Sequence, residues 1–150
     1  MTTTALPHQP RLHVLLADPD HDFFARVSLL LDEAAPRRHT VQWASSYAFA
    51  VGTVRRHPYD LCLVSSQIGR RSGNDLIAHY RTHHPELPAI MLVGGGEMPD
   101  PCGPAPVDCL DRDRLTPEML RRAIRDAIFR TASRATISGC ASAPMPRATA

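Results

Sequence analysis

The sequence predicts one α/β domain in which short buried strands alternate with amphipathic helices. Two observations lead to this fold class. Short apolar runs recur along the chain, and between them apolar residues recur at steps of three and four. A length of 150 residues, 43% of them hydrophobic and 21% charged, suffices for a single core. We therefore expect a doubly wound parallel sheet with helices on both faces.

The first half of the chain predicts strands at residues 12–17 and 39–44 and helices at 22–35 and 47–56. Asp18-Pro19-Asp20 breaks the first apolar run, so that strand ends in a loop. The first helix carries apolar residues at positions 23, 27, 30, 31 and 34. Pro36 and Pro58 mark the ends of the two helices, since proline cannot continue one.

The second half begins with two continuous apolar runs, at 61–64 and 89–93, which are typical of central parallel strands. Between them, a loop at 67–71 leads to Ser72 as the N-cap of a third helix. A short fifth strand is expected at 107–110, and Thr116-Pro117-Glu118 is a strong start signal for the last helix. Four prolines at 99, 101, 104 and 106 exclude a helix between the last two strands.

Right-handed crossovers favour a flavodoxin-like strand order, 2-1-3-4-5, for five such strands. The expected division is a flexible leader at 1–10, one domain at 11–131 and a disordered tail at 132–150, where the composition shifts to Ser, Ala, Thr, Pro and Gly.

Composition and charge exclude several classes of function. The formal net charge is only +2, which argues against a nucleic-acid or membrane-surface binder. All 17 basic residues are arginine, so lysine chemistry of any kind is absent. The cysteines at 62, 102, 109 and 140 form no metal or disulfide motif, and no apolar run could span a bilayer. We expect a cytoplasmic protein with neither metal nor cofactor.

Ligands of doubly wound folds bind at the carboxyl ends of the strands. The residues at or just beyond those ends are therefore the candidate site, and in this chain they are Asp18, Pro19, Asp20, Ser65, Val93 and Arg112.

Several motifs in this order resemble the receiver (CheY-like) domain of two-component response regulators, over about residues 11–130. V-L-L-A-D-P-D at 14–20 is similar to the acidic loop after the first strand, and Y-D-L-C-L-V-S-S at 59–66 to the phosphoacceptor segment. I-G-R-R-S-G-N-D-L-I at 68–77 resembles the loop entering the third helix. The stretch at 107–125 is similar to the last strand and helix, particularly in receivers joined to cyclic-di-nucleotide signalling modules.

The resemblance implies a pocket with two adjacent acids, an acceptor aspartate, a hydroxyl residue and a lysine, which together hold magnesium and a phosphoryl group. In this chain the acid pair reads Asp18-Pro19, with Asp20 one residue further on. The acceptor position is Ser65, the hydroxyl position Val93 and the lysine position Arg112, while the aromatic switch position is Cys109. Only Asp18 matches, so a degenerate pseudo-receiver is expected.

Two structural consequences follow from these departures. Arg112 is expected to pair with Asp18 and Asp20 across the empty pocket and to hold one conformational state without phosphate. The fourth helix of the family is expected to be shortened or lost, which would remodel the output surface.

Three further constellations have more ordinary interpretations. His79, His83 and His84 are interpreted as surface residues rather than metal ligands. Gly94-Gly95-Gly96 lacks the remaining glycine pattern and the helix start of a phosphate loop. Arg121, Arg122, Arg125 and Arg130 are interpreted as a solvated helix face.

The expected function is a non-enzymatic, phosphorylation-independent protein-interaction module in two-component, phosphorelay or cyclic-di-nucleotide signalling. Its partner would be a signalling protein, and a homodimer is left open. One alternative is a small-ligand sensor that uses the vacated pocket. Another is a decayed gene product whose fold is marginal.

Overall fold

The computed structural model describes residues 11–94 and 108–142. Five parallel strands form one sheet in the order β2-β1-β3-β6-β7, flanked by four helices. This is the predicted 2-1-3-4-5 order, because β6 and β7 are the fourth and fifth strands of the sheet. The elements are β1 Leu12–Ala17, α1 His21–Ala34, β2 His39–Ala44, α2 Tyr47–Arg56, β3 Leu61–Ser65, β4 Gln67–Ile68, β5 Arg71–Ser72, α3 Gly73–His83, β6 Ala89–Val93, β7 Asp108–Asp111, a 3-10 turn at Arg112–Arg114, and α4 Pro117–Ser142.

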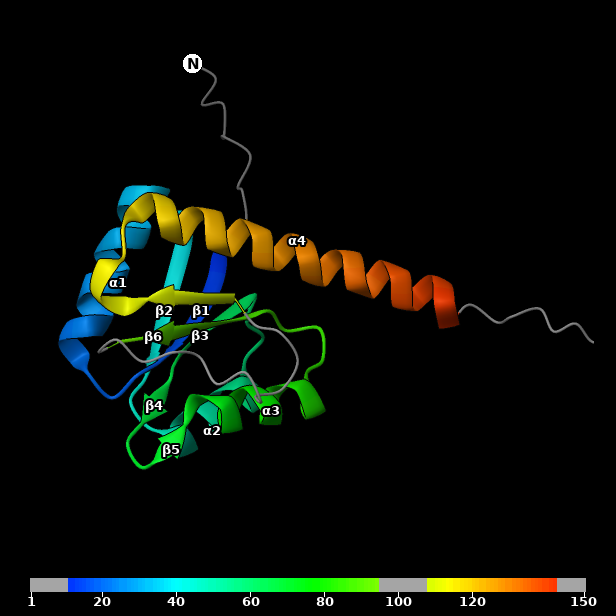
Figure 1. Ribbon diagram of the computed structural model, residues 1–150, viewed down its shortest axis with the longest axis horizontal. Coiled ribbons are helices and arrows are strands. Elements are labelled where there is room, and N and C mark those ends of the chain that lie inside the picture. The colour runs from blue at the N-terminus through cyan, green and yellow to red at the C-terminus, as the bar shows by residue number, and fades with distance from the viewer. Residues whose placement is uncertain (1–10, 95–107, 143–150) are drawn as a thin grey trace, which may run out of the picture.

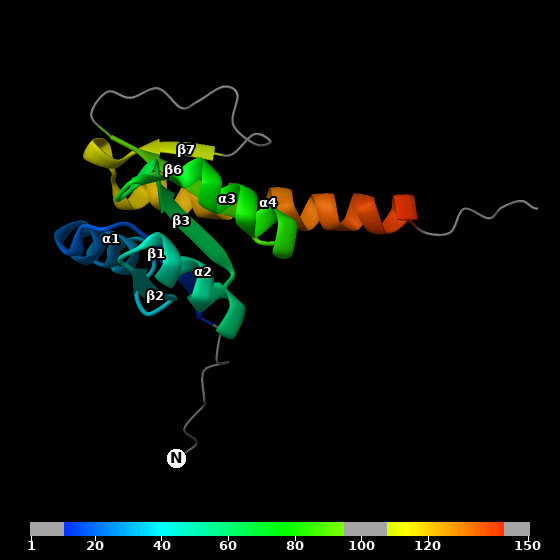
Figure 2. The same cartoon turned by 90° about the horizontal axis from the view of Figure 1, so that it is seen from below.

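The sheet is covered on both faces, with α1 and α4 on one side and α2 and α3 on the other (Figure 1), and α2 and α3 are nearer the viewer in Figure 2. Alternate residues of each strand face opposite helix layers, as the two-residue repeat of a strand requires. In β1, for example, Leu16 packs toward α1 and α4 while Leu15 packs toward α2 and α3. The continuous apolar run of β3 reflects this double burial, since all five of its residues are buried.

Side-chain caps begin all four helices of the described structure, and those at Ser72 and Thr116 were predicted from the sequence. Asp20, Ser46 and Ser72 are the N-caps of α1, α2 and α3, and each side chain accepts a hydrogen bond from a backbone N–H of the first turn. The Thr116 hydroxyl accepts from the Met119 amide at 3.1 Å in the same way at the start of α4. These bonds satisfy amides that have no acceptor inside the helix.

The expected loop at 67–71 is wrong in part, because β4 and β5 form a small antiparallel hairpin there. Gln67 pairs with Ser72 and Ile68 with Arg71. Gly69 occupies the turn with a φ of 62°, a left-handed conformation that glycine adopts without a steric cost. Two-residue strands are too short for an alternating pattern to appear in the sequence.

The expected disordered tail at 132–150 is wrong as far as Ser142, because α4 continues to that residue (Figure 1). The Ser-, Ala- and Thr-rich composition of this segment predicted disorder, whereas residues 132–142 are helical. Residues 131–142 contain no proline, and alanine and arginine favour a helix once its first turns are fixed by packing. Residues 1–10 and 143–150 lie outside the described part of the chain, as does most of the segment on which the loss of a fourth helix was predicted.

Candidate functional site

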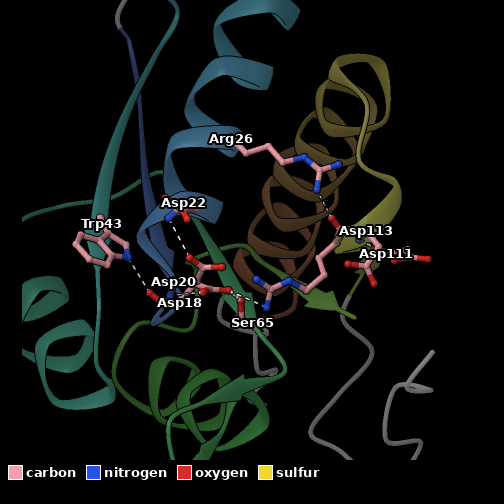
Figure 3. Close-up of polar contacts among 9 residues, drawn as sticks. Asp18, Asp20, Asp22, Arg26, Trp43, Ser65, Asp111 and Asp113 are labelled. Atoms are coloured by element: carbon pink, nitrogen blue, oxygen red, sulfur yellow. Dashed lines mark hydrogen bonds and ion pairs between the residues drawn. The ribbon is translucent and has the colours of Figure 1, made fainter. Parts of the chain in front are cut away.

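The carboxyl ends of the strands bring together three of the predicted site residues. Asp18 directly follows β1, Ser65 is the last residue of β3, and Arg112 follows β7. Since β1 and β3 are hydrogen-bonded neighbours in parallel register, Asp18 and Ser65 lie side by side (Figure 3). Arg112 reaches them from the far edge of the sheet.

Asp18 is fully buried, and both of its carboxylate oxygens and its backbone carbonyl accept hydrogen bonds. Its Oδ1 atom accepts the Asp20 amide at 2.7 Å, and its Oδ2 atom accepts the Ser65 hydroxyl. Its backbone carbonyl accepts the Trp43 indole N–H at 2.7 Å, which ties the residue to β2. A carboxylate removed from water needs such donors, because an unsolvated charge is costly.

Arg112 supplies the countercharge, with Nη1 3.1 Å from Asp18 Oδ2. Its guanidinium carbon lies 4.1 Å from the centre of the Phe23 ring, a cation–π contact between the 3-10 turn and α1. Its carbonyl accepts from Arg26 Nη1 at 3.3 Å, also from α1 (Figure 3). The side chain is 26% exposed, so it covers the buried Asp18 from the solvent side.

A glycine makes room for the Arg112 side chain. A Cβ atom added at Gly94, just after β6, would lie 2.5 Å from Arg112 Cδ and 2.6 Å from its Cγ. These atoms belong to the middle of the arginine side chain, so a Cβ atom at this position would force either Arg112 or the end of β6 to shift. Gly94 was part of a motif weighed only for phosphate binding, and nothing in the sequence indicated this role.

Asp20 does not join the expected ion pair with Arg112 in the described structure. Its side chain accepts the Asp22 amide at 2.9 Å and caps α1 instead, and both Pro19 and Asp20 are exposed. The local reason is that an acid two residues before a helix amide satisfies that amide at close range. The pocket therefore contains one buried carboxylate rather than two.

The two remaining predicted positions lie outside this polar cluster. Val93 is 7% exposed and packs in the apolar layer toward α2 and α3. Cys109 is exposed on β7. Neither offers the hydroxyl or aromatic group that the family resemblance implies for those positions.

The polar groups of the site are satisfied by one another, through an ion pair and a hydrogen bond. Its one buried carboxylate is already bound to a cation and a hydroxyl, and its other buried polar residue, Ser65, is an alcohol that donates to that carboxylate. In the described residues there is no cluster of three or more His, Cys, Asp or Glu side chains that could hold a metal ion. Hard cations such as Mg²⁺ prefer carboxylate oxygens, and in this polar cluster Asp18 is the one buried carboxylate.

Two histidines of α3, His79 and His83, lie close together. The ring centres of His79 and His83 are 4.5 Å apart. Burial lowers the pKa of His79, and the nearby His83, His84 and Arg55 lower it further. The lowered pKa favours the neutral form of His79.

Comparison with solved structures identifies the fold. The chain matches a sensor protein from Polaromonas sp. JS666 with a TM-score of 0.70 and 21% identity, over 81% of this chain and 99% of that one. It matches a receiver domain protein (CheY-like) from Methanospirillum hungatei JF-1 with a TM-score of 0.68 and 14% identity, over 83% and 98%. The signal receiver domain of an HD domain-containing protein from Pseudomonas fluorescens Pf-5 gives a TM-score of 0.70 and 22% identity, over 82% and 98%.

No protein-family model matches the sequence, and no curated protein is recognisably similar to it. The structural matches define the class all the same: this is the fold of response-regulator receiver domains, the flavodoxin-like arrangement that the sequence predicted. Among the described helices, none is both long and apolar enough to cross a membrane.

Proposed function

We propose that this chain is a receiver-type signalling domain that works without aspartyl phosphorylation, as a protein-interaction module rather than an enzyme. One observation carries the proposal. Ser65 stands where the resemblance places the acceptor aspartate, and it donates a hydrogen bond to Asp18, which Arg112 neutralises. The acceptor is missing, and the acid that would hold a metal is occupied within the chain.

The mechanism would be a fixed conformation rather than a switch. In a switching receiver, a bound phosphoryl group changes the relative stability of two states. Here the guanidinium of Arg112, which follows β7, pairs with Asp18 at the end of β1 and lies against the Phe23 ring of α1. This internal cation–carboxylate pair would favour one state permanently, so that a partner protein meets the same surface at all times.

The pathway is proposed from similarity. The stretch at 107–125 resembles receivers joined to cyclic-di-nucleotide modules. The fold also matches, with a TM-score of 0.67 and 18% identity, the N-terminal domain of a response regulator/sensory box/GGDEF 3-domain protein from Carboxydothermus hydrogenoformans. These similarities support the proposal that the domain acts in two-component, phosphorelay or cyclic-di-nucleotide signalling.

A titration of the full chain followed by NMR tests the proposal. Magnesium is added first and then beryllofluoride, which mimics a phosphoryl group on an aspartate. Trp43 is the only tryptophan of the chain and its indole N–H donates to Asp18, so one resolved signal reports on the pocket. We expect this signal and the Ser65 and Arg112 amides to stay unchanged.

The Ser65→Asp variant is the matched comparison, because it restores a carboxylate at the end of β3 without changing any other group. An ordinary receiver titrated in parallel verifies the reagents. Saturable shifts of the Trp43 indole and the Ser65 amide in the wild-type chain would overturn the proposal, since they would show that the pocket accepts a phosphoryl mimic without an acceptor aspartate.

The small-ligand alternative has less support from the geometry. Asp18 and Ser65 are fully buried beneath Arg112, so a ligand would first have to break the ion pair. Thermal stabilisation of the chain by a metabolite, lost in the Arg112→Ala variant, would favour this alternative. Cooperative unfolding would argue against a decayed, marginal fold.

A further inference from the structure

A groove lies at the amino ends of the strands, on the opposite edge of the sheet from Asp18. Its walls come from the start of β1, the end of α2 with the loop into β3, the loop between α3 and β6, and the middle of α4. The strand arrows in Figure 1 point away from this end of the sheet, and α4 runs past it. The groove has a volume of about 630 Å³, and sites for small ligands usually measure about 300–1,000 Å³.

The floor of the groove is apolar and belongs to both layers of the core. Leu12 and Ile128 pack against the layer of α1 and α4, whereas Tyr59 and Leu87 pack against the layer of α2 and α3. All four side chains are only partly buried. Apolar surface therefore remains open at the groove, and covering it with an apolar group would remove it from water.

Backbone hydrogen bonds fix the loops around the groove. The Asp60 amide donates to the His13 carbonyl, and the Asp60 carboxylate accepts the His13 amide, both at 2.8 Å. The Leu87 amide donates to the His84 carbonyl at 3.0 Å. Because these loops are already ordered, a ligand would meet a formed site and would not have to order it.

The segments that border the groove carry a surplus of positive charge. They contain five arginines and five histidines but two acids, counted over residues 11–13, 55–60, 79–88 and 128–132. One of the acids, Asp60, already accepts the His13 amide, and the other, Glu86, is exposed. Arg55 and Arg56 both line the groove, and within the described residues neither forms an ion pair with an acid.

The histidines of α3 indicate the same surplus. After burial, the causes that lower the pKa of His79 are the nearby charges of His83, His84 and Arg55, and no acid is among those causes. Like charges therefore face one another where the ends of α2 and α3 meet. A bound anion at this end of the sheet would offset their repulsion.

We propose that this groove binds a small organic anion with an apolar body. The body lies on Leu12, Leu87 and Ile128, and the anionic group pairs with Arg55 at the rim. A guanidinium suits this role, because it presents several donors in a plane to the oxygens of a carboxylate, sulfonate or phosphate. The groove and the Asp18 pocket lie at opposite edges of the sheet, so this inference goes beyond the proposed function and does not rest on it.

Two matched probes test the proposal with the full chain. The first, 8-anilino-1-naphthalenesulfonate, has an aromatic body and a sulfonate, and the second, N-phenyl-1-naphthylamine, has the same body without the sulfonate. We expect fluorescence titrations to show saturable binding of the sulfonate, about tenfold tighter than binding of the neutral probe. In NMR spectra the sulfonate should shift the amides of Leu12, Tyr59 and Leu87 and leave the Ser65 amide and the Trp43 indole unchanged.

Substitutions separate the role of charge from that of shape. Arg55→Gln should weaken binding of the sulfonate about fivefold to tenfold and leave binding of the neutral probe unchanged. Thr131→Trp, which places a large side chain in the groove from α4, should weaken both probes. Arg70→Gln removes an equal charge from the turn between β4 and β5, at the other edge of the sheet, and should change neither.

Circular dichroism of each variant verifies its fold. Three results would each overturn the proposal: a sulfonate probe that does not saturate, amide shifts confined to the Asp18 pocket, or an Arg55→Gln variant that binds the sulfonate as tightly as the wild-type chain. The response to beryllofluoride is a separate measurement, so either proposal can fail without the other.

Discussion

At the scale of the residue, the buried carboxylate of Asp18 depends on the groups that replace water around it. It has no exposed surface, and its donors are the Ser65 hydroxyl, the Asp20 amide and the Arg112 guanidinium. Removing one charged partner from a buried pair leaves the other charge uncompensated. The contribution of Arg112 is therefore best measured by its removal.

We expect Arg112→Ala to lower the free energy of unfolding by about 1–3 kcal/mol, less than for a fully buried pair because Arg112 is partly exposed. Urea denaturation provides the measurement. Arg114→Ala is the control, since the Arg114–Asp111 pair two residues away is exposed and should contribute at most about 0.5 kcal/mol. Equal losses in the two variants would contradict the assigned role of Arg112.

Gly94→Ala tests the space through which Arg112 passes. The added methyl group would overlap the arginine stem, so we expect a loss of about 1–3 kcal/mol in the wild-type background. In the Arg112→Ala background the same change should cost little, because the stem is gone. A double-mutant cycle measures this coupling, and strictly additive losses would show that Gly94 serves another purpose.

At the scale of the element, the junction between β3 and α3 requires a residue without a side chain. A Cβ atom at Gly73 would overlap the Ser65 carbonyl oxygen, which is backbone and cannot rotate away, and would lie 3.0 Å from the Ser65 carbonyl carbon. The start of α3 therefore packs directly on the end of β3. This contact positions Ser65 beside Asp18.

We expect Gly73→Ala to destabilise the chain by roughly 2–4 kcal/mol, because either α3 or β3 must shift. Gly52→Ala is the matched control within α2, where the nearest atom is the flexible end of Arg56 at 3.9 Å. There alanine should stabilise by up to about 1 kcal/mol, since it favours a helix more than glycine does. Thermal unfolding compares the two, and a well-tolerated Gly73→Ala would refute the close packing.

The start of α4 was predictable from its sequence, whereas its length depends on the packing of its first turns. Its first turns were predictable from the Thr116 cap, Pro117 and the inward residues Leu120 and Ile124, all of which the structure confirms in those roles. Its end was not predictable from composition. Helix formation is cooperative, so packing of the early turns against α1 and the sheet supports later turns whose residues only tolerate a helix.

At the scale of the whole molecule, stability should depend on pH through half-buried histidines. Burial, the largest cause, lowers the pKa of His39 below 6.5, and burial lowers the pKa of His79 as well. The unfolded chain then binds more protons than the folded chain once the pH falls below about 6.5. Acidification should therefore favour unfolding.

We expect the free energy of unfolding to fall as the pH drops from about 8 to about 5, and the His39→Gln, His79→Gln double variant to reduce that slope. The exposed His57→Gln change is the control and should preserve it. Urea midpoints at several pH values give the comparison. An identical slope in the double variant would mean that carboxylates, not these histidines, set the acid stability.

Much of the architecture was determined by the sequence itself. The strands at 39–44 and 89–93 and the helix at 47–56 agree with the structure residue for residue. Their bounds depend on the spacing of apolar residues within each segment, which the sequence shows directly. The parallel order followed from chain connectivity. The location of the candidate site was predictable as well. Once the strand order is known, the carboxyl ends of the strands bring Asp18, Ser65 and Arg112 to the same edge of the sheet.

The tertiary structure alone decided how those residues are used. Asp20 caps α1 instead of pairing with Arg112, Phe23 and Trp43 support the pocket from α1 and β2, and Gly94 leaves space for an arginine stem. Each of these contacts joins positions far apart in the chain or competes with a local hydrogen bond. Whether each contact forms depends on distances between atoms in the folded chain, and the amino-acid sequence does not give those distances directly.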